Sequence, residues 1–393
     1  MRNKIAIVIA ILSLQFIGGT YMNAVTPILA TMGQALNVTD PSTLSLVATM
    51  PALAMIITNL LCGRLTQTMK TKPLIYFGLV LFLIGGIGPV FASDINTILV
   101  LRAIMGLGGG FIMPLGVSLV PSYFSGQPQV TMMGLVNATN GVVCTVAALL
   151  GGFLAVISWQ TPFWIYTVAI VPLLVVLFFL PEPEKPQLQS GEKPAAIPGI
   201  VYLYAGSALI LFACIIMVLN GISGFIAGEG MGTVATAGIA VSLFTVGSFV
   251  ASLLFGKLFA ALKRWTLTVA ILISVIGILL LVLAPSFSVV CVATVLIGLS
   301  IGMLSPTLFT KTALVSPHNV NGATSFVMTG LLAGQFLSSL LMKIIFAVIH
   351  TTSMRSLFAA DGIIMAVCLV VAAIAAIRTK KVEISSPNAE SNF

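Results

Sequence analysis

Long apolar runs separated by short polar stretches dominate the chain. Twelve runs can be drawn, each close to the ~20 residues that a helix needs to cross the hydrocarbon core of a bilayer. An even number of crossings predicts that both termini lie on one side. The predicted membrane-spanning helices cover residues 5–32, 42–63, 73–92, 96–121, 130–157, 160–180, 199–222, 234–257, 266–285, 288–313, 322–347 and 357–377.

One polar segment divides the apolar pattern in the middle. Residues 181–198 hold five prolines and five charged residues, a composition that no spanning helix tolerates. We predict a solvated linker there, between an N-terminal six-helix bundle at residues 1–180 and a C-terminal bundle at 199–378. Residues 379–393 are expected to form a polar tail.

The two halves repeat each other in sequence. Leu-Leu-Cys-Gly-Arg-Leu at 60–65 returns as Leu-Leu-Phe-Gly-Lys-Leu at 253–258, an offset of 193 residues. Gly106-Leu107-x-x-Gly110-x-x-x-Pro114 returns at 298–306 with an offset of 192. Two patterns at nearly the same offset indicate an internal duplication and thus two pseudo-symmetric bundles.

Composition and charge agree with an all-α integral membrane protein. Hydrophobic residues make up 59% of the chain and charged residues only 7%, too few to cover a soluble globule of 393 residues. The net charge of +8 does not indicate nucleic-acid binding, because 14 of the 17 lysines and arginines fall in segments on the side of the termini. By the positive-inside rule that side is the cytoplasm. We therefore predict a multi-pass protein of a bacterial cytoplasmic membrane.

No cofactor, metal site or catalytic centre is predicted. The five cysteines lie in apolar runs without metal-ligand spacing. Neither histidine has an acidic partner nearby, which argues against a membrane-embedded enzyme. A GxxxxGK[ST] loop for ATP is also missing from the sequence.

Two six-helix halves, a central linker and a repeated basic stretch resemble the major facilitator superfamily. Gly63, Leu65 and Lys72 match the family's loop pattern after helix 2, but Gln67 stands where an aspartate is usual. Leu-Val-Leu-Arg-Ala-Ile-Met-Gly at 99–106 resembles the helix-4 pattern of the drug:proton antiporter branch. Gly151-Gly152 keeps only the glycine pair of that branch's helix-5 signature.

The resemblance implies a central cavity lined by helices 1, 4, 7 and 10. Polar residues at these positions are Gln15, Asn23, Arg102, Asn220 and Ser305, among several methionines. Such an apolar wall with few polar groups suits a hydrophobic or amphipathic substrate.

Arg102 is the candidate with the clearest physical rationale. A guanidinium about seven residues into a spanning helix keeps its proton and must face the protein interior or water. Its counterpart in the second half is Thr294. We weigh a role in coupling or anion attraction against a structural role in which Arg102 binds carbonyl groups.

Other candidates concern coupling and conformational change. Asp361 is the one plausible membrane-embedded carboxylate for proton coupling, although it could also cap its helix. The remaining positions, which the resemblance implies, are Gly63, Arg64, Lys72, Gly151 and Gly152. Lys343 fits a snorkelling residue better than a substrate contact. Asp40 and Asp94, each just before a predicted helix, fit N-terminal caps better than functional acids.

These features predict a monomeric secondary active transporter. We favour proton-coupled export of neutral or amphipathic small molecules, including drugs, by rocking of the two halves. Transport of a small organic anion is the second hypothesis, suggested by Arg102, Lys343 and the scarcity of buried acids. A sensor that binds ligand without transporting it is a third.

Overall fold

The structure is a computed structural model that describes residues 2–124, 127–182, 197–316 and 320–385. Its described residues form helices and connecting turns without strands. The α-helices are α1 (Arg2–Thr20), α2 (Leu29–Ala35), α3 (Pro41–Thr68), α4 (Thr71–Ile87), α5 (Ile95–Tyr123), α6 (Gln127–Leu154), α7 (Ile170–Phe179), α8 (Gly199–Gly228), α9 (Val234–Leu262), α10 (Thr266–Val282), α11 (Phe287–Val315), α12 (Val320–Ile349) and α13 (Met354–Ser385). Short 3-10 helices are η1 (Thr26–Ile28), η2 (Gly88–Phe91), η3 (Thr161–Ala169) and η4 (Lys263–Trp265).

Length and hydropathy identify ten stretches of the described chain that could cross a membrane. One of them, Val234–Val282, comprises both α9 and α10, and the apolar part of α1, Ile5–Thr20, is a shorter addition. Together these make the twelve crossings predicted from the apolar runs. Exposed leucines, isoleucines, valines and phenylalanines cover the outside of the bundle, as a lipid-facing surface requires.

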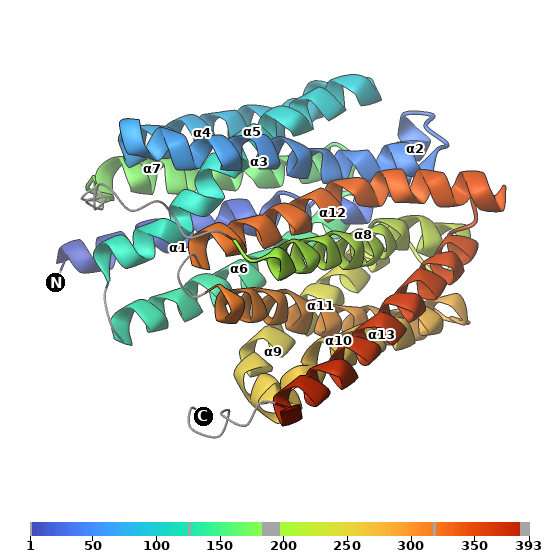
Figure 1. Ribbon diagram of the computed structural model, residues 1–393. Coiled ribbons are helices and arrows are strands. Elements are labelled where there is room, and N and C mark those ends of the chain that lie inside the picture. The colour runs from blue at the N-terminus through green and yellow to red at the C-terminus, as the bar shows by residue number, and fades with distance from the viewer. Residues whose placement is uncertain (1, 125–126, 183–196, 317–319, 386–393) are drawn as a thin grey trace.

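The two halves have matching internal packing. In the first half α5 packs against α3 and α4, and in the second half α11 packs against α9 and α10. These are the pairs that the internal repeat relates. The halves meet through α6 against α9 and α3 against α12 (Figure 1).

The helices of the bundle run between two ends, called the termini end and the far end. The termini end is where α1 begins, at the left of Figure 1, and where α13 finishes, at the bottom of the picture. The far end, at the right, carries α2 and the connection between α12 and α13. Because the spanning helices alternate in direction, α3 and α9 begin at the far end, whereas α6, α8 and α12 finish there.

The first predicted helix, 5–32, is wrong as a continuous element. Helix α1 ends at Thr20, and the chain continues through a turn into η1 and α2. Pro27 has no N–H to continue a helical ladder, and the Val25 N–H bonds to the Met22 carbonyl rather than to that of Tyr21. The break therefore leaves the Tyr21 carbonyl available to other donors.

Helix ends elsewhere follow local sequence. Asp40 accepts a hydrogen bond from the Ser42 N–H at 3.0 Å, and Asp94 accepts one from Thr97 at 2.9 Å, which confirms both as N-terminal caps. Helix α3 continues to Thr68, past the predicted end at residue 63. Arg64 consequently lies within a helix rather than in the loop expected after residue 63.

Candidate functional site

Arg102 is completely buried in the N-terminal half and surrounded by acceptors from three segments. Its Nε donates to the Val47 carbonyl of α3 at 2.7 Å, and its Nη2 donates to the Tyr21 carbonyl at the end of α1. Nη1 donates to the Tyr166 hydroxyl at 2.8 Å, and the guanidinium lies 5.4 Å from the centre of that ring. Arg102 thus joins α1, α3, α5 and η3.

Local sequence explains why the Val47 and Tyr21 carbonyls lack their usual helical donors. Pro51 lies inside α3 and cannot donate the helical hydrogen bond to the carbonyl four residues earlier, which is that of Val47. The Tyr21 carbonyl is released where α1 breaks, and it also accepts from the Tyr166 hydroxyl at 3.1 Å. Without Arg102 the Val47 carbonyl would be buried without a partner, and the Tyr21 carbonyl would keep only the Tyr166 hydroxyl.

The charge of Arg102 has no carboxylate within ion-pair distance among the described residues. Hydrogen bonds, the Tyr166 ring and a contact to Met105 Sδ at 3.0 Å are what stabilise the buried cation. Only a planar guanidinium with donors on three nitrogens reaches all these groups at once.

A polar seam joins the two halves near the far end. Asn220 of α8 donates to Ser45 Oγ of α3 at 2.9 Å, and Ser339 of α12 bonds both Ser45 Oγ at 2.8 Å and Thr49 Oγ1 at 2.7 Å. Other bonds in the seam are Tyr21 to Gln335, Gln335 to Met22, Ser223 to Pro27, Ala30 to Ser223, Thr145 to Thr245 and Ser242 to Thr145. Within the described chain, the hydrogen bonds between halves lie in the far portions of their helices and involve neutral groups.

The glycine pair at 151–152 makes two different close contacts. A Cβ added at Gly152 would lie 2.7 Å from the Gly238 Cα of α9, across the seam. One added at Gly151 would collide with the Ala24 carbonyl, beside the break after α1. Gly152 therefore permits close approach between halves, and Gly151 permits packing within the first half.

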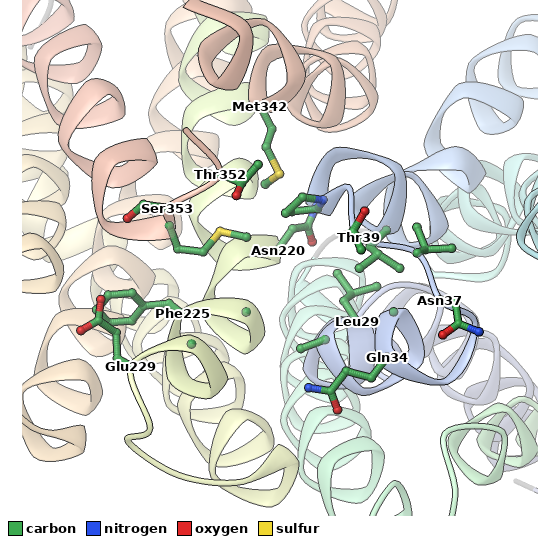
Figure 2. A pocket seen from close by; sticks show the side chains of 18 residues that line it. Leu29, Gln34, Asn37, Thr39, Asn220, Phe225, Glu229, Met342, Thr352 and Ser353 are labelled. Atoms are coloured by element: carbon green, nitrogen blue, oxygen red, sulfur yellow. The ribbon is translucent and has the colours of Figure 1, made fainter. Parts of the chain in front are cut away.

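A cavity of about 540 Å³ opens between the halves at the far end (Figure 2). Leu29, Leu44, Phe225 and Met342 are its buried apolar residues, and Asn220 lies among them. Its exposed polar residues are Gln34, Asn37, Thr39, Glu229, Thr352 and Ser353. The N-terminal half contributes α2 and the start of α3, and the C-terminal half contributes the ends of α8 and α12 and the start of α13.

The five residues predicted to line a central cavity lie in different surroundings. Of these five residues, Asn220 is the one that lines the far-end cavity. Gln15, Asn23 and Ser305 are half-buried, and their side chains bond to carbonyls of their own helical segments, those of Ile11, Gly19 and Ile301. No hydrogen bond joins any two of the five in the part of the chain that the structure describes.

Two of the predicted conformational residues, Gly63 and Arg64, have side-chain surroundings outside the described structure. Lys72 lies at the start of α4 and donates from Nζ to the Leu177 carbonyl at 3.1 Å. The adjacent Thr71 and Lys72 N–H groups bond to the Glu182 carboxylate, which caps α4. Lys72 thereby ties α4 to the end of α7.

Asp361 is fully buried in the eighth position of α13. Neither carboxylate oxygen accepts a hydrogen bond from an N–H or O–H group in the described structure. Cys214 of α8 and Cys368 of α13 lie close enough to interact with it electrostatically. Asp361 is too far along α13 to cap its N-terminus, which favours the other prediction for this residue, a buried titratable site.

Sequence reasoning missed most of the seam and the partners of Arg102. A visible signal existed for the seam, since Ser45 and Thr49 on α3 and Gln335 and Ser339 on α12 are each four residues apart and so share a helix face. The proline at position 51 also marked a free carbonyl. Tyr166 gave no signal, because an aromatic residue in a spanning segment is ordinary.

Comparison with known families matches the Major Facilitator Superfamily model at residues 11–232 and 207–392. The multidrug efflux pump SdrM of Staphylococcus aureus is 27% identical over 229 residues, which are 57% of this chain and 50% of that protein. Multidrug resistance protein 3 of Bacillus subtilis is 27% identical over 152 residues, 38% of this chain and 29% of that protein. The matches thus span half or less of these two curated relatives.

Solved structures show the same fold at low sequence identity. The nucleoside transporter NupG superposes with a TM-score of 0.77 at 13% identity, covering 93% of this chain and 99% of that one. A bacterial homologue of the human lysosomal transporter Spinster, in an inward-facing and unoccupied conformation, has a TM-score of 0.69 at 14% identity, covering 95% and 96%.

Proposed function

The chain belongs to the Major Facilitator Superfamily, and from that premise we propose that it is a secondary active transporter that exports uncharged or amphipathic small molecules in exchange for protons. The observation that carries this proposal is the seam between the halves. Its described hydrogen bonds lie toward the far end, as expected for a protein that alternately closes one end of the bundle and then the other.

The chemistry of the seam suits repeated opening and closing. Hydroxyl and amide groups make its hydrogen bonds, and each such bond contributes only about 0.5–1.5 kcal/mol. When the halves separate, water replaces these partners. The close contact of Gly152 with Gly238 lets the seam form without interdigitated side chains that would have to be withdrawn.

Substrate class is inferred from the relatives and from the charges. SdrM and Multidrug resistance protein 3 are described as a multidrug efflux pump and a multidrug resistance protein. Arg102 donates to backbone and hydroxyl groups of its own half, which leaves little capacity for an anionic substrate. The organic-anion hypothesis therefore receives less support than export of uncharged or amphipathic compounds.

Asp361 is the proposed proton site. A carboxylate without N–H or O–H partners is costly to bury in charged form, so we propose that Asp361 carries its proton while it is closed off from water. A conformational change that admits water would favour release of the proton. Gly151, Gly152 and Lys72 are proposed to shape this change through the packing described above. Gly63 and Arg64 are proposed to contribute through their place within the repeated basic stretch.

Localisation and assembly are proposed on the same basis. The cation-rich termini end is assigned to the cytoplasm of a bacterium and the far end to the outside. The protein is proposed to act as a monomer, with the lipid bilayer, the small-molecule substrate and protons as its partners.

The test is transport by purified protein in liposomes under an imposed pH gradient. Movement of an uncharged lipophilic dye and the internal pH are followed together. Asp361→Asn is expected to abolish gradient-driven dye accumulation while keeping downhill dye exchange. Asp94→Asn is the matched control, because asparagine also caps helices and Asp94 is exposed.

Three results would contradict parts of the proposal. If the native protein does not move the dye, the proposed export of uncharged compounds is wrong. Proton flux that appears only when organic anions are supplied would favour the anion hypothesis. If Asp361→Asn still accumulates dye in response to the pH gradient, Asp361 is not the proton-coupling residue.

A further inference from the structure

Asn220, a lining residue of the far-end cavity, has a buried acceptor that the seam leaves unused. Asn220 is only 4% exposed and lines the cavity. Its Nδ2 donates to Ser45, while its Oδ1 has no hydrogen-bond partner among the described residues. An amide oxygen buried without a partner is unfavourable by about 1–3 kcal/mol, which a donor placed in the cavity would recover.

The walls around Asn220 fit an amphipathic molecule. Leu29, Leu44, Phe225 and Met342 surround the buried part, and the mouth carries side-chain amides and hydroxyls (Figure 2). A volume of about 540 Å³ lies within the range of ligand sites. The cavity thus offers an apolar body site, one buried acceptor and a polar rim.

Charges near the cavity cancel and disfavour an ionic ligand. Glu229 on the rim is held by two hydrogen bonds from Arg355, with Nη2 to Oε2 at 2.8 Å. Asp40 and Lys343, of opposite sign, interact electrostatically with each other. No cation is among the lining residues, so an anion would find no opposite charge there.

We infer that this cavity is a second ligand site, distinct from any central transport site, which binds uncharged amphipathic molecules through a hydrogen bond from an N–H or O–H group to Asn220 Oδ1. The site is built from both halves, with α2 and α3 on one side and α8, α12 and α13 on the other. Separation of the halves at the far end would take its walls apart. A bound ligand therefore holds the far end closed.

This consequence rests on the proposed alternating-access function and gives the site a regulatory effect. A compound that has accumulated on the far side would bind there and slow further cycles. Ligand binding at this site does not require transport. The proposed site and the proposed transport function can therefore be contradicted independently.

The experiment uses a matched pair of probes. N-Benzylacetamide has an amide N–H, and N-benzyl-N-methylacetamide has the same aromatic body and carbonyl without that donor. Full-length protein in nanodiscs carries a reporter cysteine at Ser353→Cys on the rim, and its labelling rate by a membrane-impermeant maleimide is measured at increasing probe concentration. Ser93→Cys, in another exposed far-end loop, is the control position, and the parent protein reports labelling of the native cysteines.

The donor amide is expected to slow labelling at Ser353→Cys, but not at Ser93→Cys, at concentrations roughly tenfold lower than the methylated amide. Asn220→Leu should abolish that difference, whereas Ser45→Ala should preserve it because Oδ1 remains. Benzylamine and phenylacetate, the charged probes, should protect more weakly than the donor amide.

Equal protection by the two amides in the native protein would overturn the inference, whatever the variants do. Protection at both cysteines would mean bilayer partitioning and would overturn it too. If protection is as expected but liposomes show no dye transport, the proposed function fails and the site stands. In transporting liposomes, donor amide added at the far side should lower the maximal rate of dye movement without changing the dye concentration at half-maximal rate.

Discussion

Arg102 Nε lies 2.7 Å from the carbonyl of Val47, the acceptor that Pro51 leaves without its helical donor. A proline in one helix and an arginine in another thus form a single structural unit. The arrangement explains how a buried cation persists in the first half without a carboxylate partner in the described structure.

Replacement of Arg102 should therefore destabilise the protein rather than only impair coupling. Arg102→Leu leaves the buried Val47 carbonyl without a donor and the Tyr21 carbonyl with only the Tyr166 hydroxyl, and the expected loss from the orphaned acceptor is about 1–3 kcal/mol. Adding Pro51→Ala should recover part of it, roughly 1 kcal/mol, because an alanine N–H can bond to the Val47 carbonyl. Thermal unfolding in detergent measures both effects.

Pro306→Ala is the matched control for that rescue, since Pro306 lies inside α11 of the other half. It should give no recovery in the Arg102→Leu background. Equal recovery by both proline substitutions would show that the Val47 carbonyl is not the group that Arg102 serves.

Substitutions at the neighbouring glycines Gly151 and Gly152 should affect different properties, folding stability for the first and far-end closure for the second. Gly151→Ala is expected to lower the melting temperature, because its Cβ meets the Ala24 carbonyl within the same half. Gly152→Ala should instead weaken far-end closure and increase maleimide labelling of Leu332→Cys, a residue in the small apolar cluster with Ala52 and Met55 at the seam. Gly206→Ala, which meets nothing within 4 Å, should change neither quantity. If Gly151→Ala and Gly152→Ala both lower the melting temperature and neither changes labelling, the two glycines do not have these different roles.

The seam should weaken when its central hydroxyl is removed. Ser339→Ala deletes bonds to Ser45 and Thr49, so labelling of Leu332→Cys is expected to rise roughly 2- to 10-fold. Ser207→Ala on α8 is the control, because Ser207 is half-buried and its hydroxyl bonds, within the described chain, to the Leu203 carbonyl of its own helix. If the two variants label alike, the hydroxyl chain does not contribute to closure.

The Glu229–Arg355 pair should respond to acid in a defined direction. The hydrogen bond from Arg355 lowers the pKa of Glu229 below its ordinary 4.5, although partial desolvation opposes the shift. Its stabilising contribution is therefore fully present above pH 4.5 and is lost as pH falls through the lower folded-state pKa. The melting-temperature difference between native protein and Glu229→Gln should be constant from pH 7 to about 4.5 and should then shrink to zero as pH falls through the lower folded-state pKa. A difference that already shrinks between pH 7 and 5 would contradict the lowered pKa.

Sequence features predicted much of the fold because the bilayer imposes length and polarity on every crossing. The twelve apolar runs, the repeat at 192–193 residues and the caps at Asp40 and Asp94 are each local or periodic signals. Errors arose where tertiary contacts replace local hydrogen bonds. The break after Thr20 is the main example, since Arg102 and Tyr166 satisfy the Tyr21 carbonyl there.

The candidate site was predicted less completely. Arg102 and Asp361 stood out because charged residues within apolar runs are rare, and both are fully buried. The proposed cavity set was based on a family resemblance, and only Asn220 of its five residues lines the cavity found at the far end. Half-buried Ser305 and Gln15 bond to carbonyls of their own helices, a choice that spacing along the chain does not reveal.

The sequence by itself determined that this protein crosses a membrane as two related six-helix halves, because apolar length and internal repetition are properties of the chain alone. Tertiary structure decided which carbonyls Arg102 satisfies, which glycine approaches the opposite half and where Asn220 keeps a free acceptor. These are relations between helices far apart in sequence, and only packing brings their donors, acceptors and backbones within contact distance.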